Sequence, residues 1–196
     1  MGYANLSPGQ CRAELTKRKI KTRPAGLPAQ GVATPVRLSE PLQGVAFIAP
    51  GKRSVYGMLD CRLVLALDEL ARVLERHGVV KVHVDNLYRP RSRLPGKRKR
   101  SQHAHGLAVD VRALELEDGR VLLVERDWYG SVASPACGPA STVTTKADEA
   151  ILLRNIVCDV VREGVFHHVL TPSYDAAHRD HVHLDIKRGA RAVIVR

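Results

Sequence analysis

The sequence predicts an α+β domain in which helices pack on a mostly antiparallel sheet. Two observations support this prediction. Apolar residues with a helical period occur in a few separate segments, and short segments with a period of two lie between them, two of these joined by a hairpin signal. The chain has 196 residues, of which 44% are hydrophobic. This length suits one compact domain with a core and is short for two.

The first part of the chain carries little periodic pattern. Residues 1–35 mix clusters of basic residues with Pro24, Pro28 and Pro35, apart from a possible short helix around residues 10–19. We therefore expect residues 1–35 to be a loosely attached basic arm. A single domain is then expected over residues 36–196.

The most regular helical pattern comes next. Four leucines at steps of four, three and four residues form the apolar stripe of an amphipathic helix over residues 60–77, and Gly78 is placed to end it. Residues 80–84 then alternate valines with polar side chains. This alternation predicts a half-buried strand that runs toward Tyr88.

A hairpin is predicted in the middle of the chain. Residues 107–112 alternate apolar and polar side chains, which places Asp110 on a strand. The Asp118-Gly119 pair then separates this strand from a second one at residues 121–124.

The second half of the chain predicts a loop, a helix and two strands. Residues 131–145 are rich in Ser, Thr, Pro and Gly and are expected to form a long loop. Thr145, with Asp148 three residues later, marks the start of a helix that ends near Gly164. Residues 165–170 and 181–186 are strand candidates.

Histidines cluster in two segments. His103 lies seven residues before Asp110, with Gly106 between them, so that a turn can bring the imidazole and the carboxylate together. On the last predicted strand, His181 and His183 share one face. The other histidines that we considered are expected to be structural or solvated, namely His77, His83, His167 and His168.

These residue types suit a metal site. Imidazole nitrogens and carboxylate oxygens are ordinary zinc ligands, and a catalytic zinc normally takes three ligands from the protein. His103 and Asp110 supply two of them. Either His181 or His183 can supply the third, which leaves the other free for proton transfer. Asp180 and Asp185 are spare carboxylates, and Asp185 could accept a hydrogen bond from a ligand imidazole.

Several motifs carry a family resemblance. The pattern S-x-H-x-x-G-x-A-x-D at residues 101–110, followed by H-x-H, resembles the LAS group of zinc metallopeptidases, which includes lysostaphin-type and D-alanyl-D-alanine peptidases. The run YDAAHRDHVHLD at residues 174–185, with the LDCRLVLALDEL and ERDW segments, resembles the extensin-like C-terminal domain family over about residues 35–188. The spacing of the three histidines in that run also resembles a motif of penicillin-insensitive murein endopeptidases.

The resemblance implies a fold, a site and an activity. The fold would be that of the LAS and hedgehog-type domains. His103, Asp110 and His183 would bind zinc, with His181 beside the reacting water as a base or oxyanion partner. The activity would be hydrolysis of peptide bonds in bacterial peptidoglycan, of the D,D-carboxypeptidase or endopeptidase type. A metal-containing module that binds cell-wall polymer without cutting it is the alternative.

Two further residues are candidates for the site. Arg89 follows Tyr88 and resembles an arginine that contacts substrate near the zinc in D-alanyl-D-alanine peptidases of this group. Its guanidinium could clamp a carboxylate, although a solvated surface arginine is the other interpretation. His178 would line the cleft.

The charge of the chain limits its partners. The formal net charge is +11, and residues 89–100 read RPRSRLPGKRKR. Peptidoglycan peptides or another anionic cell-wall polymer would suit this basic stretch, which also resembles a solvated surface or a nucleic-acid patch. Only 4% of the residues are aromatic and no nucleic-acid-binding motif accompanies the charge, so nucleic acid is the disfavoured partner.

The cysteines and the lengths of the apolar segments limit where in the cell the protein can be located. Cys11, Cys61, Cys137 and Cys158 allow two disulfides in three possible pairings, or four reduced thiols. No apolar stretch approaches the roughly 20 residues that span a bilayer. Residues 1–20 lack the apolar segment of a secretory signal, so we expect either an intracellular chain or one that has lost its signal. The family resemblance implies a periplasmic or secreted protein.

Overall fold

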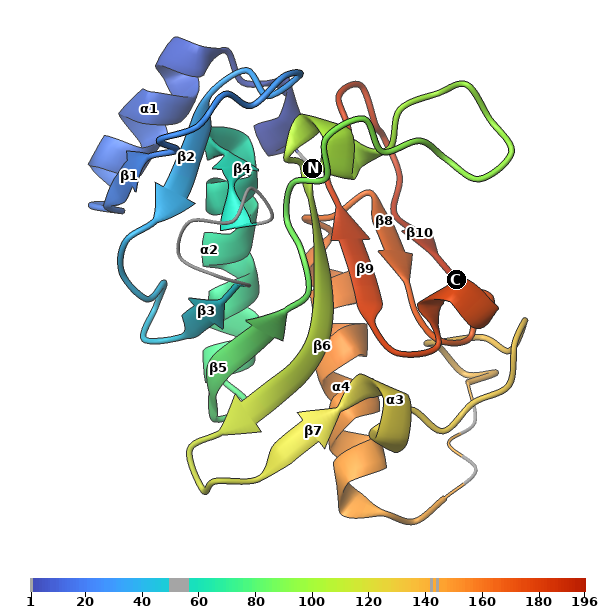
Figure 1. The fold of residues 1–196 in the computed structure, drawn as a ribbon. Coiled ribbons are helices and arrows are strands. Elements are labelled where there is room, and N and C mark those ends of the chain that lie inside the picture. Colours follow the sequence, from blue (N-terminus) through green and yellow to red (C-terminus); the bar gives the residue numbers. More distant parts are fainter. Residues whose placement is uncertain (1, 50–56, 142, 144) are drawn as a thin grey trace.

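A curved sheet forms the centre of the molecule (Figure 1). The computed structural model describes residues 2–49, 57–141, 143 and 145–196. The strand order of the sheet is β10-β8-β9-β6-β5-β3, and β7 also pairs with β6. The strands are β3 (Ala46–Ile48), β5 (Val79–Val84), β6 (Ala108–Leu116), β7 (Val121–Leu123), β8 (His168–Leu170), β9 (Val182–Asp185) and β10 (Ile194–Val195).

Most of the strand pairs are antiparallel. Strand β6 is antiparallel to β5, β7 and β9, and β8 is antiparallel to β9. The pairs at the two edges, β3 with β5 and β10 with β8, are parallel. The predicted α+β class with a mostly antiparallel sheet is therefore confirmed.

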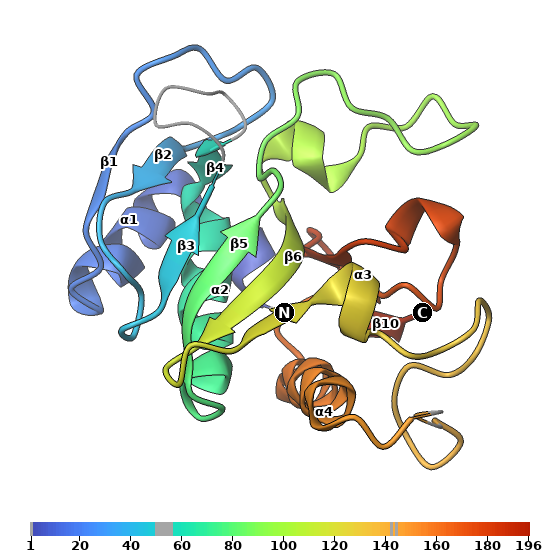
Figure 2. The same cartoon turned by 60° about the horizontal axis from the view of Figure 1, so that its bottom comes forward.

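Two long helices cover one face of this sheet. Helices α2 (Cys61–Glu75) and α4 (Asp148–Glu163) lie on the same side of the strands, and Figure 2 views α4 almost along its axis beneath the sheet. Leu74 of α2 and Leu153 of α4 meet Val111 and Leu184 of the sheet in an apolar core. The burial of these side chains is the main favourable contribution to folding.

The helix ends differ in how well the sequence predicted them. Helix α2 begins after Asp60, whose carboxylate accepts the backbone N–H of Arg62, and Gly78 follows it with a positive φ, as expected. Helix α4 begins at Asp148 rather than at Thr145. The Thr145 hydroxyl instead accepts a hydrogen bond from the backbone N–H of Ala147, before the first turn.

The first 35 residues are not the loose arm that the sequence suggested. The 3-10 helix η1 (Gly2–Asn5) and helix α1 (Pro8–Lys17) pack on α2, and a disulfide joins Cys11 to Cys61. Ala4 and Leu15 are buried. Strands β1 (Thr22–Pro24), β2 (Pro35–Leu38) and β4 (Leu59–Asp60) form a second, antiparallel sheet beside them.

The segment between β7 and α4 is anchored at two points. It begins with the short helix α3 (Val124–Asp127), and the predicted loop follows. A disulfide joins Cys137 in this loop to Cys158 in α4. The buried guanidinium of Arg154 stacks 4.0 Å from the Trp128 ring and donates to the carbonyls of Tyr129 and Ala136 at 2.6 and 2.9 Å. Both anchors come from α4.

Among the described residues, no helix combines the length and the apolar composition that a bilayer crossing requires. Two further helices in the described part of the chain, η3 (Gln102–His105) and η4 (Ala176–His178), are single turns. Both lie beside the open face of the sheet, which α2 and α4 do not cover (Figure 1).

Candidate metal centre

The first histidine of the site lies in a tight turn before β6. The Ser101 hydroxyl accepts the backbone N–H of His103 and thereby caps η3. Gly106 ends the turn at φ +63°, and a Cβ atom there would lie 2.9 Å from the backbone nitrogen of Asp60. Only glycine fits this close approach without strain. The turn therefore fixes where the His103 ring lies before β6 begins.

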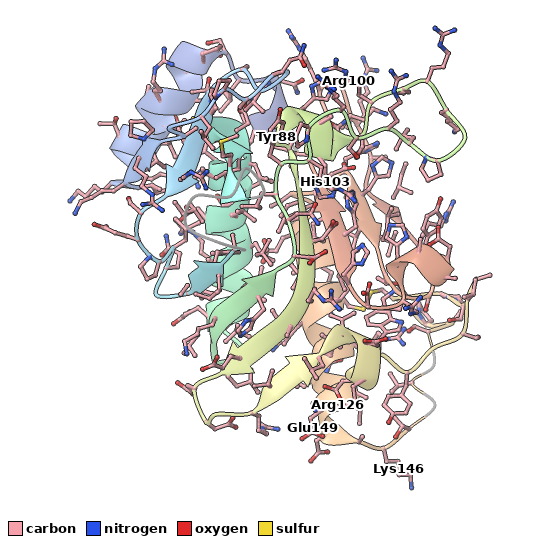
Figure 3. The ribbon with its side chains drawn as sticks, in the orientation of Figure 1. Tyr88, Arg100, His103, Arg126, Lys146 and Glu149 are labelled. Atoms are coloured by element: carbon pink, nitrogen blue, oxygen red, sulfur yellow. A yellow bond between two sulfur atoms is a disulfide. The ribbon has the colours of Figure 1, made fainter. Side chains whose placement is uncertain are left out.

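Three predicted ligands converge on one point. His103 Nε2 lies 3.0 Å from Asp110 Oδ1, His183 Nδ1 lies 2.8 Å from the same oxygen, and the two ring nitrogens are 3.1 Å apart. Asp110 on β6 is directly paired with His183 on β9. All three side chains are buried, and Figure 3 shows His103 at the end of the turn. The predicted set His103, Asp110 and His183 is thus brought together.

This arrangement fits a small divalent cation. Donors about 2.1 Å from a tetrahedral zinc are about 3.4 Å apart, a few tenths of an ångström more than the separations seen here. The tautomers also fit, because His103 Nδ1 donates to the Leu87 carbonyl at 2.9 Å and His183 Nε2 faces Asp185 Oδ2 at 3.3 Å. Because these partners occupy the other nitrogen of each ring, His103 Nε2 and His183 Nδ1 are the nitrogens that can bind a metal ion. The residues present therefore suit the expected ion.

The three predicted ligands shift one another's pKa values. Burial would raise the pKa of Asp110, but the close contacts of its carboxylate with His103 and His183 hold that pKa well below its usual range. Burial lowers the pKa of His103, which keeps its imidazole neutral. Burial also disfavours the charged form of His183, but its bonds to Asp110 and Asp185 outweigh this and raise its pKa to about 9.

His181 and His178 lie beside the three ligands. The Nδ1 of His181 donates to Asp180 at 2.8 Å, and its Nε2 lies 3.7 Å from Asp110 Oδ1. The Nδ1 of His178, in η4, contacts Asp175 at 2.7 Å, and its ring centre is 5.1 Å from that of His181. The Nδ1 atom of each imidazole thus faces its own carboxylate, and Nε2 points away from that carboxylate.

Arg89 stands at the rim of the same site. Its Nη2 is 3.9 Å from Asp110 Oδ2, and its side chain is about half exposed. A guanidinium in this position has donors left for a bound ligand. Its assignment as a substrate clamp stays a prediction.

Two residues that the sequence analysis did not select belong to the site's surroundings. His168 was expected to be structural or solvated, but its Nδ1 contacts Asp185 at 2.9 Å, and Asp185 in turn faces His183. Arg112 was not considered, although a period of two from Asp110 pointed to it. Its Nη2 lies 3.1 Å from Asp180, the partner of His181.

The pairing of β6 with β5 is irregular at Arg112. His83 of β5 pairs with Ala113 and Val84 pairs with Val111, so Arg112 has no partner across the ladder. Alternation sets the face of the sheet on which Arg112 lies, and the bulge increases the local twist of β6 there. Arg112 also lies where β6 stops pairing with β9 and begins pairing with β7.

A groove of about 300 Å³ opens where β6 stops pairing with β9 and begins pairing with β7. It is lined by Arg112, Leu123, Glu125, Arg126 and Asp180. Figure 3 shows Arg126 well below His103 in that view, on the far side of the open face from Arg100. Through Asp180, the groove adjoins His181.

Comparison with known proteins identifies the family. No curated protein matches this chain. The family model described as "Extensin-like protein C-terminus" matches residues 9–195, a span that includes α1 from its second residue onward and the whole site. The chain therefore belongs to the extensin-like protein C-terminus family.

Proposed function

We propose that this protein is a zinc-dependent peptidase of the LAS type that hydrolyses peptide bonds of bacterial peptidoglycan. The observation that carries the proposal is the buried convergence of His103 Nε2, His183 Nδ1 and Asp110 Oδ1 within 3.1 Å of one another. A structural zinc is usually enclosed by four protein ligands, whereas three leave a position for water or substrate. Peptidoglycan as the substrate follows from the family resemblance alone.

The chain's own residues have distinct roles in this proposal. A zinc ion held by the three ligands would polarise the scissile carbonyl and lower the pKa of a water molecule. His181 Nε2, which lies 3.7 Å from Asp110 Oδ1, would accept a proton from a water molecule in this site and return it to the leaving amine. Asp180 holds the His181 ring in the required tautomer through Nδ1. Arg89 would bind a substrate carboxylate at the rim, and His178 would line the cleft.

The two disulfides support a periplasmic or secreted location. Cys11 pairs with Cys61, and Cys137 with Cys158. Disulfides of this kind form and persist in oxidising compartments and are rare in the cytosol. The proposed substrate lies in such a compartment.

The first experiment measures metal and activity on the same samples. The wild-type protein, His183→Ala and His181→Ala are reconstituted with zinc, analysed for elemental zinc and incubated with peptidoglycan fragments that are then read by mass spectrometry. We expect near-stoichiometric zinc in the wild-type protein, little in His183→Ala, and retained zinc without hydrolysis in His181→Ala. His105→Ala is the matched control, because His105 lies in the same turn but its Nδ1 contacts the Gly31 carbonyl at 3.0 Å and is not one of the three converging ligand atoms.

The outcomes separate the alternatives. A wild-type protein that holds no zinc after reconstitution would contradict the proposal. Stoichiometric zinc with no cleavage of any fragment would favour the metal-containing binding module instead.

A further inference from the structure

Residues 89–100 form a strongly basic hairpin at the rim of the metal centre. They contain seven basic residues and no acidic one, and all seven side chains are exposed. The seven are Arg89, Arg91, Arg93, Lys97, Arg98, Lys99 and Arg100. They supply seven of the eleven units of formal net positive charge. We call residues 89–100 the basic hairpin.

The backbone holds this hairpin in shape. Leu94 donates to the Lys99 carbonyl at 3.0 Å, and Ser101 donates to the Ser92 carbonyl at 3.0 Å. Gly96 takes a positive φ at the turn between the two arms. The charged side chains are therefore presented by an ordered main chain.

Most charges of the basic hairpin have no carboxylate partner among the described residues. In the part of the chain that the structure describes, none of its basic side chains other than Arg89 lies within 4.0 Å of a carboxylate. Arg93 and Arg100 are directly paired across the hairpin. Like charges at opposed positions destabilise a hairpin. A bound polyanion would remove this repulsion.

The basic hairpin is joined to the metal centre at both ends. The backbone N–H of Arg89 donates to the His103 carbonyl at 3.1 Å, and Ser101 at the other end caps the turn that carries His103. Figure 3 shows Arg100 close above His103 in that view. A polymer bound to the hairpin would therefore lie beside the open face of the sheet.

The chemistry of the hairpin selects the kind of polyanion. Five of its seven cations are arginines, whose planar fork suits the oxygens of phosphate groups. No aromatic side chain lies within it to stack on bases, which a single-stranded nucleic acid would use. Leu94 is its only large apolar side chain, too little for insertion into a membrane.

We propose that the basic hairpin binds a linear, phosphate-bearing polymer of the cell envelope. Phosphate binding rests on the hairpin alone, whereas the envelope as its source rests on the proposed function. Binding would hold the protein on the polymer while the metal centre meets neighbouring peptides. This step needs neither zinc nor His181.

The test uses a phosphodiester chain without bases. A fluorescent abasic chain of about 16 units, the upper end of single-strand site sizes, is titrated with the full-length protein over a range of salt concentrations. The hairpin variant carries R91Q, R93Q, R98Q and K99Q. The control variant carries R12Q, K17Q, K19Q and R23Q, which removes the same charge from exposed positions near the N-terminus.

We expect the wild-type protein to bind the abasic chain and the hairpin variant to bind at least about tenfold more weakly at low salt. The slope of log K against log salt should become shallower by about 3 in that variant, since each phosphate contact contributes about 0.7. The control variant and His183→Ala should bind like the wild-type protein. Zinc content should be unchanged in the hairpin variant.

Three results would overturn the proposal. They are no binding by the wild-type protein, an equal loss in the control variant, and tighter binding of an oligonucleotide of the same length than of the abasic chain. The last result would indicate nucleic acid as the partner. His183→Ala removes a proposed zinc ligand but keeps the basic hairpin. Its binding of the abasic chain therefore tests the hairpin even if the peptidase proposal fails.

Discussion

The two faces of the central sheet are built from the same strands but hold opposite kinds of side chain. On β9, Val182 and Leu184 enter the apolar core under α2 and α4, whereas His183 and Asp185 point to the open face. The covered face is held by contacts that need no particular partner. The open face instead holds buried titratable groups that stabilise one another only as a set.

This difference separates stability from chemistry within one sheet. A substitution on the covered face should change the free energy of unfolding and leave the metal site intact. A substitution on the open face should change metal binding or reactivity with a smaller effect on the core.

The largest effect is expected on the covered face. Leu153 in α4 is 1% exposed, and Leu153→Ala should lower the free energy of unfolding by about 2–5 kcal/mol, because it removes buried methyl groups and leaves a cavity. Urea denaturation measures this change. Ile151 lies on the same helix but is 41% exposed, so Ile151→Ala should cost less than about 0.5 kcal/mol. Zinc affinity should be unchanged in both variants. If Leu153→Ala lowered both the free energy of unfolding and the zinc affinity, the two faces of the sheet would not be independent.

The next effect is a pH dependence that belongs to the open face alone. The pKa of His183 is raised to about 9, so its imidazole is charged at neutral pH and must lose a proton before it can bind zinc. His103 has a lowered pKa and is already neutral. Zinc affinity should therefore rise about tenfold per pH unit, or about 100-fold between pH ~6.5 and ~8.5.

Calorimetric titrations in buffers with different ionisation enthalpies measure this proton release. We expect about one proton per zinc at neutral pH, in the wild-type protein and in Leu153→Ala alike. Zinc binding that releases no proton would show that His183 is neutral before the ion binds, contrary to the contacts with its two carboxylates.

The smallest effect concerns Arg112. Its contact with Asp180 is half exposed, and such pairs contribute at most about 1 kcal/mol, so Arg112→Leu should slow hydrolysis by no more than about fivefold. The ¹⁵N chemical shifts of the His181 ring report the tautomer directly. They should change in Arg112→Leu and less in Arg112→Lys, with full zinc content in both. Unchanged shifts in Arg112→Leu would mean that Asp180 orients His181 without help.

Local patterns predicted much of the fold. The leucine stripe located α2, the valine alternation located β5, and the Asp118-Gly119 pair located the turn between β6 and β7. The two-residue strand β4 and the three-residue strands β1 and β3 were not predicted. Elements this short carry no readable period and depend on their neighbours.

The N-terminal segment shows why composition alone did not predict its packing. Its basic residues and prolines indicated an arm, yet Arg18 donates to Asp68 and Glu69 of α2 at 3.0 and 2.7 Å. The disulfide between Cys11 and Cys61 fixes the same contact. Neither the partner carboxylates nor the partner cysteine can be read from the segment itself.

The sequence by itself determined the candidate metal ligands and the face of each strand on which they lie, because alternation along a strand is a local property of the backbone. Tertiary structure decided the rest. The pairing of β6 with β9 brought Asp110 opposite His183, the cysteines formed one of their three possible pairings, and Arg112 came within 3.1 Å of Asp180. These are contacts between residues far apart in the chain, so they depend on how the strands and helices pack.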